Sequence, residues 1–143
     1  MFKLEECLVY LTKHNVKLLA EELDRRLEVR DLTHVQAAAL YFVYTYPGLT
    51  QKELARKLGR AEPTVARLVD RLQTSGFLVR RHLDRRTYRI ELTEEGYRKI
   101  TGVSGIMQGF MDDCVRGISQ EDLDTFNSVI QRMQENIVGT AEK

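Results

Sequence analysis

The side chains with the clearest capacity for chemistry are arginines on one face of a short amphipathic segment, residues 62–75. Its apolar residues recur at helical spacing and predict a face that packs inward: Val65, Leu68, Val69 and Leu72. At about 100° per residue, Thr64, Arg67 and Arg71 lie along the opposite, exposed side, with Pro63 in the first turn. Permanently charged guanidinium groups in this position suit hydrogen bonds to phosphate oxygens and to guanine.

A second group of arginines follows in a segment whose apolar and polar residues alternate, which predicts strands over 77–82 and 87–92. This group comprises Arg80, Arg81, Arg85, Arg86 and Arg89. An exposed strand edge carries some charge to prevent aggregation, but five arginines exceed that need. Adjacent arginines in the turn suit a narrow minor groove, where the negative potential is strongest. We expect Asp84 to pair with a neighbouring arginine and so fix the turn.

Charge is distributed unevenly along the chain, although the net charge is only +1. Residues 50–89 hold eleven Lys and Arg against four Asp and Glu, a local charge of +7, and the remainder carries −6. A polyanionic partner is therefore expected at the middle segment. The alternative interpretation of this charge alone is an ordinary solvated basic surface.

The elements that must position these arginines are mainly helical. Spaced leucines predict a helix over residues 4–30. Two capping boxes, Thr33 with Gln36 and Thr50 with Glu53, open a second helix that ends at Pro47-Gly48 and a third that ends at Gly59. After the arginine-bearing helix and the hairpin, two more helices begin at residues 93 and 119. The predicted fold class is mainly α with a small β-hairpin.

Two short helices joined by a tight glycine-containing turn and followed by a hairpin form a winged helix-turn-helix. We expect residues 31–96 to be this DNA-binding lobe, flanked by dimerisation helices over 1–30 and 97–143. The terminal helices carry more apolar surface than so small a lobe can cover, which predicts a homodimer. The residues expected to need a partner surface are Phe110, Met111, Phe126, Met133 and Ile137.

The sequence of residues 32–96 resembles the MarR family of bacterial and archaeal transcriptional regulators. The resemblance rests on several short motifs: Leu-Thr at 32–33, Gly-Leu-Thr-Gln at 48–51, Glu-Leu-Ala at 53–55, Pro-Thr-Val at 63–65, Arg-Leu-Val-Asp-Arg-Leu at 67–72, Asp-Arg-Arg at 84–86 and Leu-Thr-Glu-Glu-Gly at 92–96. The resemblance implies a triangular homodimer that acts as a ligand-responsive repressor on a palindromic operator in double-stranded DNA, without a cofactor.

By position, Pro63, Thr64 and Arg67 match the family's base-contacting residues, and Arg86 matches its minor-groove arginine. Arg71 extends this set toward phosphates, and Arg85 adjoins Arg86 in the turn that suits a minor groove. Two positions depart from the family pattern: Ala61 and Glu62 stand where a serine-type cap and a basic or polar residue are common. These departures leave the operator sequence open.

Two further sites are implied only by the resemblance. Family members bind small aromatic or phenolic anions beside the dimer helices, where His14, Tyr41 and Tyr44 are the candidate contacts. Cys7 lies near the position of the reactive cysteine in the family's hydroperoxide-sensing branch. Lys3 and Tyr10, each about one helical turn away, would be the neighbours of its thiol. A surface histidine and a buried, inert cysteine are the alternatives.

Other classes of function find little support in the sequence. Three scattered histidines and two cysteines, Cys7 and Cys114, match no metal-ligand, disulfide or catalytic spacing, so we expect neither an enzyme nor a bound metal. The most apolar stretch, residues 37–43, is too short to span a bilayer. The first residues lack the pattern of a signal peptide, and a cytoplasmic location is expected.

Two other binding functions of a winged helix are open to test. A protein-interaction module should present apolar anchors on the exposed face of helix 62–75, where this chain presents Thr and Arg. An RNA-binding winged helix cannot use the same face on duplex RNA, because the A-form major groove is too narrow for a helix.

Overall fold

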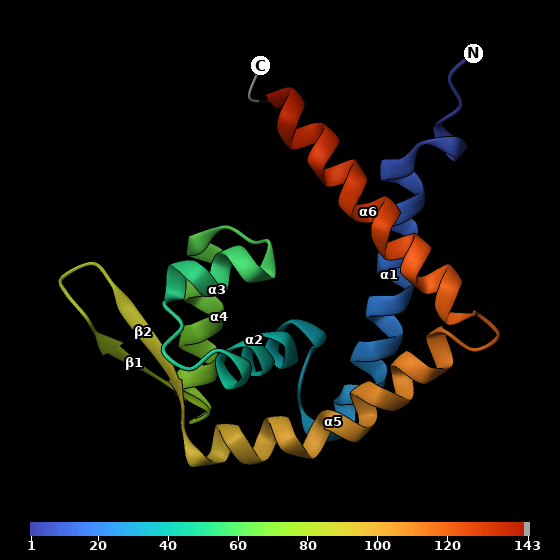
Figure 1. Cartoon of the computed structure of the whole chain (residues 1–143). Helices are drawn as coiled ribbons and strands as arrows, with labels where there is room; N and C mark the ends of the chain where they lie inside the picture. Colours follow the sequence, from blue (N-terminus) through green and yellow to red (C-terminus); the bar gives the residue numbers. More distant parts are fainter. Residues whose placement is uncertain (142–143) are drawn as a thin grey trace. The chain divides into compact units, whose positions relative to one another are not determined.

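A computed structural model describes residues 1–141 of the chain as helices and one β-hairpin (Figure 1). The helices are α1 (Leu8–Leu27), α2 (His34–Thr45), α3 (Gln51–Leu58), α4 (Glu62–Thr74), α5 (Glu94–Cys114) and α6 (Gln120–Ala141), and the strands are β1 (Leu78–His82) and β2 (Tyr88–Leu92). The chain divides into two compact units, residues 1–108 and the part from Gly109 onward, and each is described by itself. The last two residues of the predicted segment 97–143 lie outside the described residues.

The N-terminal helix is interrupted where the leucine spacing predicts one continuous helix. A short 3-10 helix, Leu4–Glu6, is followed by Cys7 in an extended conformation (φ −69°, ψ 126°), and α1 begins at Leu8. A second 3-10 turn, Glu28–Arg30, ends at Asp31 in the left-handed region (φ 54°). The prediction of a single helix over 4–30 is therefore wrong at both ends. Spaced leucines indicate the apolar face of a helix and not the backbone breaks at its termini.

The junction between α1 and α2 is fixed by one carboxylate. Asp24 Oδ1 accepts hydrogen bonds from the His34 backbone amide at 2.6 Å and from His34 Nδ1 at 2.8 Å. Partial burial acts to raise the pKa of Asp24, but the His34 hydrogen bonds outweigh it and hold that pKa below its usual range. The first turn of α2 is thus bonded to the last turns of α1.

Both predicted capping boxes are confirmed. The hydroxyl of Thr33 accepts from the Gln36 amide at 3.2 Å, and the Gln36 side chain accepts from the Thr33 amide at 3.0 Å. Thr50 and Glu53 form the same reciprocal pair at 3.1 and 3.0 Å. At the other end of α3, Gly59 adopts the left-handed conformation (φ 63°), which glycine reaches without a Cβ clash.

The hairpin is antiparallel, with Leu78 opposite Leu92 and His82 opposite Tyr88, as its alternation predicts. It also has a third participant that the sequence did not indicate. The Ile90 amide donates to the Leu49 carbonyl at 2.9 Å, and Thr50 forms a β-bridge with Arg89. The loop before α3 therefore pairs with β2, which connects the hairpin to the helix-turn-helix.

The core lies between α2, α3, α4 and the hairpin. Val65, Val69 and Leu72 of α4 are at most 1% exposed and Leu68 is half-buried, which confirms the predicted inward face of this helix. Each fully buried aliphatic side chain of this kind contributes about 1.5–3 kcal/mol. They pack with Leu40, Leu54, Leu78 and Ile90, and this burial fixes which face of α4 remains exposed.

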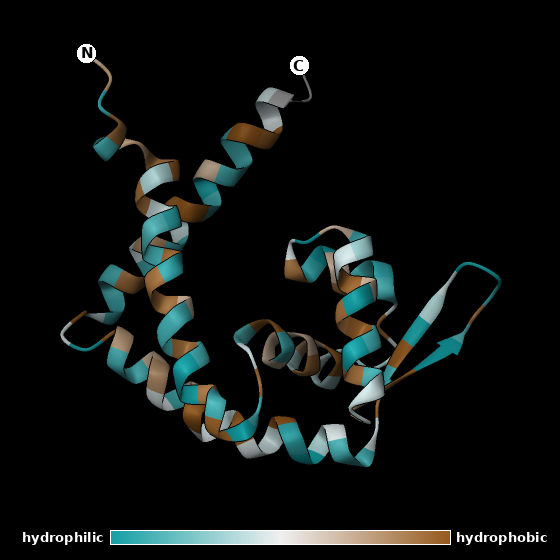
Figure 2. Cartoon of the chain, turned by 180° about the vertical axis from the view of Figure 1, so that it is seen from behind, coloured by the Kyte–Doolittle hydropathy of each residue, from teal (hydrophilic) through white to brown (hydrophobic). Residues whose placement is uncertain are grey.

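The predicted excess of apolar surface on the terminal helices is found in part. Met111, Phe126 and Ile137 are 52%, 59% and 71% exposed, and Met133 is half-buried. Phe110 is only 8% exposed, so the expectation that its ring needs a partner surface is wrong. Figure 2 shows hydrophobic segments along both α1 and α6. No helix within residues 1–141 is long and apolar enough to cross a membrane.

The start of α5 is locked against the end of α4. Thr93 Oγ1 donates to the Gly76 carbonyl at 2.5 Å and accepts from the Gly96 amide at 3.0 Å. A Cβ at Gly96 would lie 2.0 Å from the Phe77 carbonyl oxygen, a backbone atom that cannot turn aside. Position 96 therefore requires glycine for space, although its backbone is helical.

Gly96→Ala is expected to destabilise the protein by at least about 1–3 kcal/mol, the usual cost of overpacking. Gly102→Ala is the matched control on the same helix. A Cβ at position 102 would meet nothing within 4 Å. Because alanine has the higher helix propensity, this substitution should raise the free energy of unfolding by at most about 1 kcal/mol. Urea unfolding at one fixed protein concentration measures both free energies. Equal midpoints for the two variants would contradict the close approach of α5 to Phe77.

Candidate nucleic-acid interface

The exposed face of α4 carries the polar residues that the helical spacing predicts. Pro63 and Thr64 in the first turn, and Arg67 and Arg71 in the next two turns, are all exposed. Neither arginine takes part in an ion pair or side-chain hydrogen bond within the described part of the chain. The guanidinium donors of both side chains are therefore free to bind a ligand.

The hairpin turn is held by Asp84, but not through an arginine side chain. Asp84 Oδ1 accepts from the backbone amides of Arg86 at 2.8 Å and Thr87 at 2.9 Å. The Arg86 amide is the main reason that the pKa of Asp84 is lower than usual. The expected pairing of Asp84 with a guanidinium is therefore wrong, because the turn places backbone donors closer to the carboxylate.

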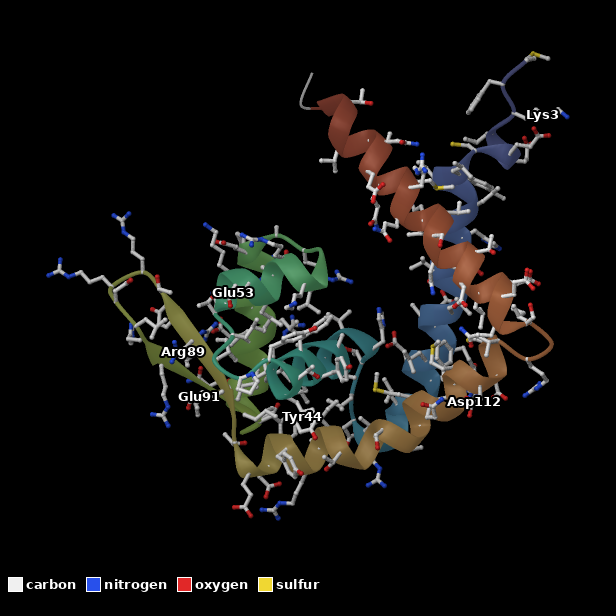
Figure 3. The ribbon with its side chains drawn as sticks, viewed as in Figure 1. Lys3, Tyr44, Glu53, Arg89, Glu91 and Asp112 are labelled. Atoms are coloured by element: carbon white, nitrogen blue, oxygen red, sulfur yellow. The ribbon has the colours of Figure 1, made fainter. Side chains whose placement is uncertain are left out.

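As a consequence, the side chains of Arg85 and Arg86 remain exposed, and neither is paired among residues 1–141. Figure 3 shows nitrogen-tipped side chains pointing away from the hairpin turn into solvent. Asp84 shapes the turn without neutralising the two cations beside it.

Arg80 has a different role from the other hairpin arginines. Its side chain is only 17% exposed and donates to three residues on two helices. Nε donates to Gln51 Oε1 in α3 at 2.9 Å, and in α4 Nη2 donates to the Ala66 carbonyl at 2.8 Å and Nη1 to Asp70 Oδ1 at 2.5 Å. A planar guanidinium with five donors can make these bonds at once. Arg80 therefore joins β1 to both helices of the helix-turn-helix.

The sequence reasoning grouped Arg80 with the exposed arginines, although a signal for its position was present. Residues i and i+2 of a strand share a face, and Leu78 is an evident core residue that is fully buried. Arg80 lies on the same face, over α4. Treating all five arginines as one exposed group overlooked the alternation of strand residues between the two faces.

The remaining hairpin arginines also contact the protein. Arg81 Nε donates to Glu91 Oε2 at 2.5 Å across the hairpin, with two thirds of its side chain exposed. The Arg89 side chain lies beside Gly48, where a Cβ would come within 3.6 Å of its Nε (Figure 3). Of the five hairpin arginines, Arg85 and Arg86 in the turn and Arg89 in β2 are exposed and have no hydrogen-bond or ion-pair partner for their side chains within residues 1–141.

A small hollow brings the hairpin turn next to the starts of α3 and α4. It is lined by Thr50, Gln51, Lys52, Glu62, Arg86, Thr87 and Tyr88. The lining is polar and combines two cations with one carboxylate. The hollow thus places Arg86 beside the first turn of α4, so that the arginines of the hairpin turn and of the helix belong to one surface.

The candidate effector residues are less clearly gathered. His14 is exposed on α1, and Tyr41 and Tyr44 are exposed on α2. The Tyr44 ring lies 5.7 Å from the ring of Tyr97 in α5 (Figure 3). No hydrogen bond or ring contact within residues 1–141 joins His14 to either tyrosine.

Cys7 is half-buried at the N-cap of α1. Lys3, the expected neighbour of its thiol, instead pairs with Glu6 at 3.3 Å. The groups of three or more His, Cys, Asp or Glu side chains that hold metal ions do not occur in the described part of the chain.

Comparison with known proteins gives consistent results. A model of the MarR family matches residues 30–86. The DNA complex of MepR from S. aureus has a TM-score of 0.83 and 24% identity, covering 94% of this chain and 99% of that one. The structure of MarR has a TM-score of 0.77 and 26% identity, covering 98% of this chain and 97% of that one. The structure of MosR from M. tuberculosis has a TM-score of 0.81 and 21% identity, covering 94% of this chain and 99% of that one.

The family match spans α2, α3, α4, β1 and the first part of the hairpin turn, and so includes Arg67, Arg71, Arg85 and Arg86. The structural likeness extends over nearly the whole of each solved chain. Residues 30–86 match the MarR family, and the chain has the winged-helix fold of the solved regulators of this family.

Proposed function

We propose that this protein is a sequence-specific regulator that binds double-stranded DNA through α4 and the hairpin turn. The observation that carries the proposal is the set of four exposed, unpaired arginines, Arg67, Arg71, Arg85 and Arg86, on one polar surface of a segment with local charge +7. Free donors aimed at solvent favour a polyanion. The solved complex of the related MepR with DNA supports this choice of partner.

The interface residues differ in which part of the DNA they can contact. The first turns of a recognition helix face base edges in the major groove, so Pro63, Thr64 and Arg67 take base contacts and Arg71 takes phosphate. Arg85 and Arg86 enter the adjacent minor groove, where an A·T-rich sequence concentrates negative potential. A protein-interaction module is disfavoured, because the exposed face of α4 presents no large apolar anchor.

The biological unit in this proposal is a homodimer on a palindromic operator, with α1, α5 and α6 as the dimerisation helices. Leu8, Leu11 and Leu18 of α1, and Phe126 and Ile137 of α6, are each about half exposed or more in the single chain. Apolar surface of this extent marks a protein–protein contact. Regulation would be repression in the cytoplasm, relieved by a small aromatic anion near His14, Tyr41 and Tyr44, with Cys7 as the candidate if oxidants act instead.

The direct test is binding to a duplex that the protein selects from a random pool. The affinity should fall steeply with salt, because each phosphate neutralised by arginine contributes roughly −0.9 to the slope of log K against log salt. Fluorescence anisotropy between about 50 and 200 mM salt measures this slope. Failure to enrich any sequence, or a slope near zero, would reject the proposed function.

Arg67→Ala and Arg71→Ala should weaken binding in different ways. Loss of Arg67 should cost about 1–3 kcal/mol and relax preference at one base position per half-site. Loss of Arg71 should weaken all duplexes alike and make the salt slope shallower by about one phosphate. Titrations of single-base variants of the selected duplex separate the two effects. The assigned orientation of α4 is wrong if Arg67→Ala leaves base preference intact.

Arg80→Lys should reduce binding about tenfold or more although the charge is unchanged, because one ammonium cannot replace the guanidinium bonds to Gln51, Ala66 and Asp70. Arg81→Lys is the matched control, since Arg81 has one exposed partner, Glu91. The salt slope should stay at the parent value in both. Equal affinities of the two variants would show that the Arg80 bonds do not position the interface.

A further inference from the structure

Glu62 is the one carboxylate among residues 46–92, all of which are described, that has no partner. The other four acidic side chains in this range are engaged: Glu53 in its capping box, Asp70 with Arg80, Asp84 with the turn amides, and Glu91 with Arg81. Glu62 is exposed and enters no hydrogen bond or ion pair within the described residues. On a surface meant for a polyanion, an unneutralised carboxylate opposes binding unless it meets a donor.

The position of Glu62 determines what it would meet. It is the first residue of α4 and lines the hollow shared with Lys52 and Arg86. Thr64 and Arg67 follow on the exposed side of the same helix. When a recognition helix enters the major groove, its N-terminal residues face base edges. Glu62 therefore lies at the leading end of the base-reading surface.

A carboxylate can only accept hydrogen bonds. In the major groove, guanine presents two acceptors and thymine presents an acceptor and a methyl group, so both disfavour a carboxylate. Adenine places an acceptor beside its amine. Cytosine presents the N4 amine, which donates without an adjacent acceptor on the same base and is the usual partner of Glu.

We propose that Glu62 is a specificity-determining residue that accepts a hydrogen bond from the N4 amine of a cytosine in each half-site. The carboxylate rewards cytosine and repels the bases that present only acceptors, so it acts by exclusion as well as by contact. This inference rests on the proposed function, since it assigns a base contact within the same interface.

A structural role for Glu62 predicts different results. Ala61, the N-cap of α4, provides no side-chain cap, and a carboxylate in the first turn stabilises a helix through its dipole. Glu94 occupies the equivalent first position of α5, where it pairs with Arg98 at 3.1 Å. Glu94→Gln therefore removes an N-terminal carboxylate outside the interface and serves as the matched control for stability.

The experiment compares the parent, Glu62→Gln, Glu62→Ala and Glu94→Gln on the selected duplex and on its full set of single-base variants. The parent should prefer cytosine at one position per half-site by roughly five- to a hundredfold, the range of a good base contact. Glu62→Ala should lose that preference. Glu62→Gln should shift it toward adenine, because an amide can both donate to N7 and accept from N6. Glu94→Gln should keep the parent pattern.

Three results would overturn the inference. If both Glu62 variants raise the affinity for every duplex by the same factor, the carboxylate only repels phosphate. If they change the unfolding temperature alone, as Glu94→Gln does, it only stabilises the helix. If the parent has no cytosine preference, there is no contact. In each case a parent that still selects a duplex preserves the proposed function, and a parent that selects none overturns both.

Discussion

The geometry of the winged helix depends on the Arg80 guanidinium. The hairpin is two-stranded, and a hairpin alone is marginally stable in water. Arg80 bonds it to α3 and α4 from the inner face of β1, and the Leu49 carbonyl bonds it to the α2–α3 loop. A buried cation costs free energy unless its donors are satisfied, and here Asp70, Gln51 and the Ala66 carbonyl satisfy them. The distance between α4 and the hairpin turn follows from these bonds.

This arrangement divides the cations of the interface into two groups. Arg80 and Arg81 are held by Asp70 and Glu91, and their charge is used within the protein. Arg67 and Arg71 are free on the exposed face of α4, and Arg85 and Arg86 are free because the Asp84 carboxylate beside them accepts from backbone amides. The carboxylates thus decide which guanidinium groups remain available to a ligand. Glu62 is the exception on this surface, and the proposed cytosine contact gives it a partner.

The two kinds of apolar surface in the chain have different consequences. The inward residues of α4 are covered within the chain and fix the orientation of the helix. The exposed leucines of α1 and the exposed Phe126 and Ile137 of α6 are not covered by it. In the proposed homodimer a second copy covers them, and the spacing between two recognition helices then follows from the terminal helices. A ligand that alters their packing would alter that spacing.

Local sequence patterns were sufficient to predict most of the helices, the hairpin and the exposed face of α4. Capping boxes, left-handed glycine and the spacing of Val65, Val69 and Leu72 are local signals, since each depends on residues within a few positions. These signals also located Pro63, Thr64, Arg67 and Arg71 on the outer side. The resemblance of residues 32–96 to the MarR family was confirmed by the comparisons.

Which charged groups are free depends on contacts between distant parts of the chain. The bonds of Arg80 connect residues 10, 14 and 29 positions apart, and no local pattern specifies such partners. The break at Cys7 and the burial of Phe110 likewise depend on backbone geometry and packing that residue types alone do not encode. Asp84 accepts hydrogen bonds from backbone amides and not from a guanidinium. The turn already fixes the positions of the amides, whereas a long arginine side chain loses conformational entropy when it is held. Whether two charged side chains pair depends on the distance between them in space, and local sequence patterns specify only their separation along the chain.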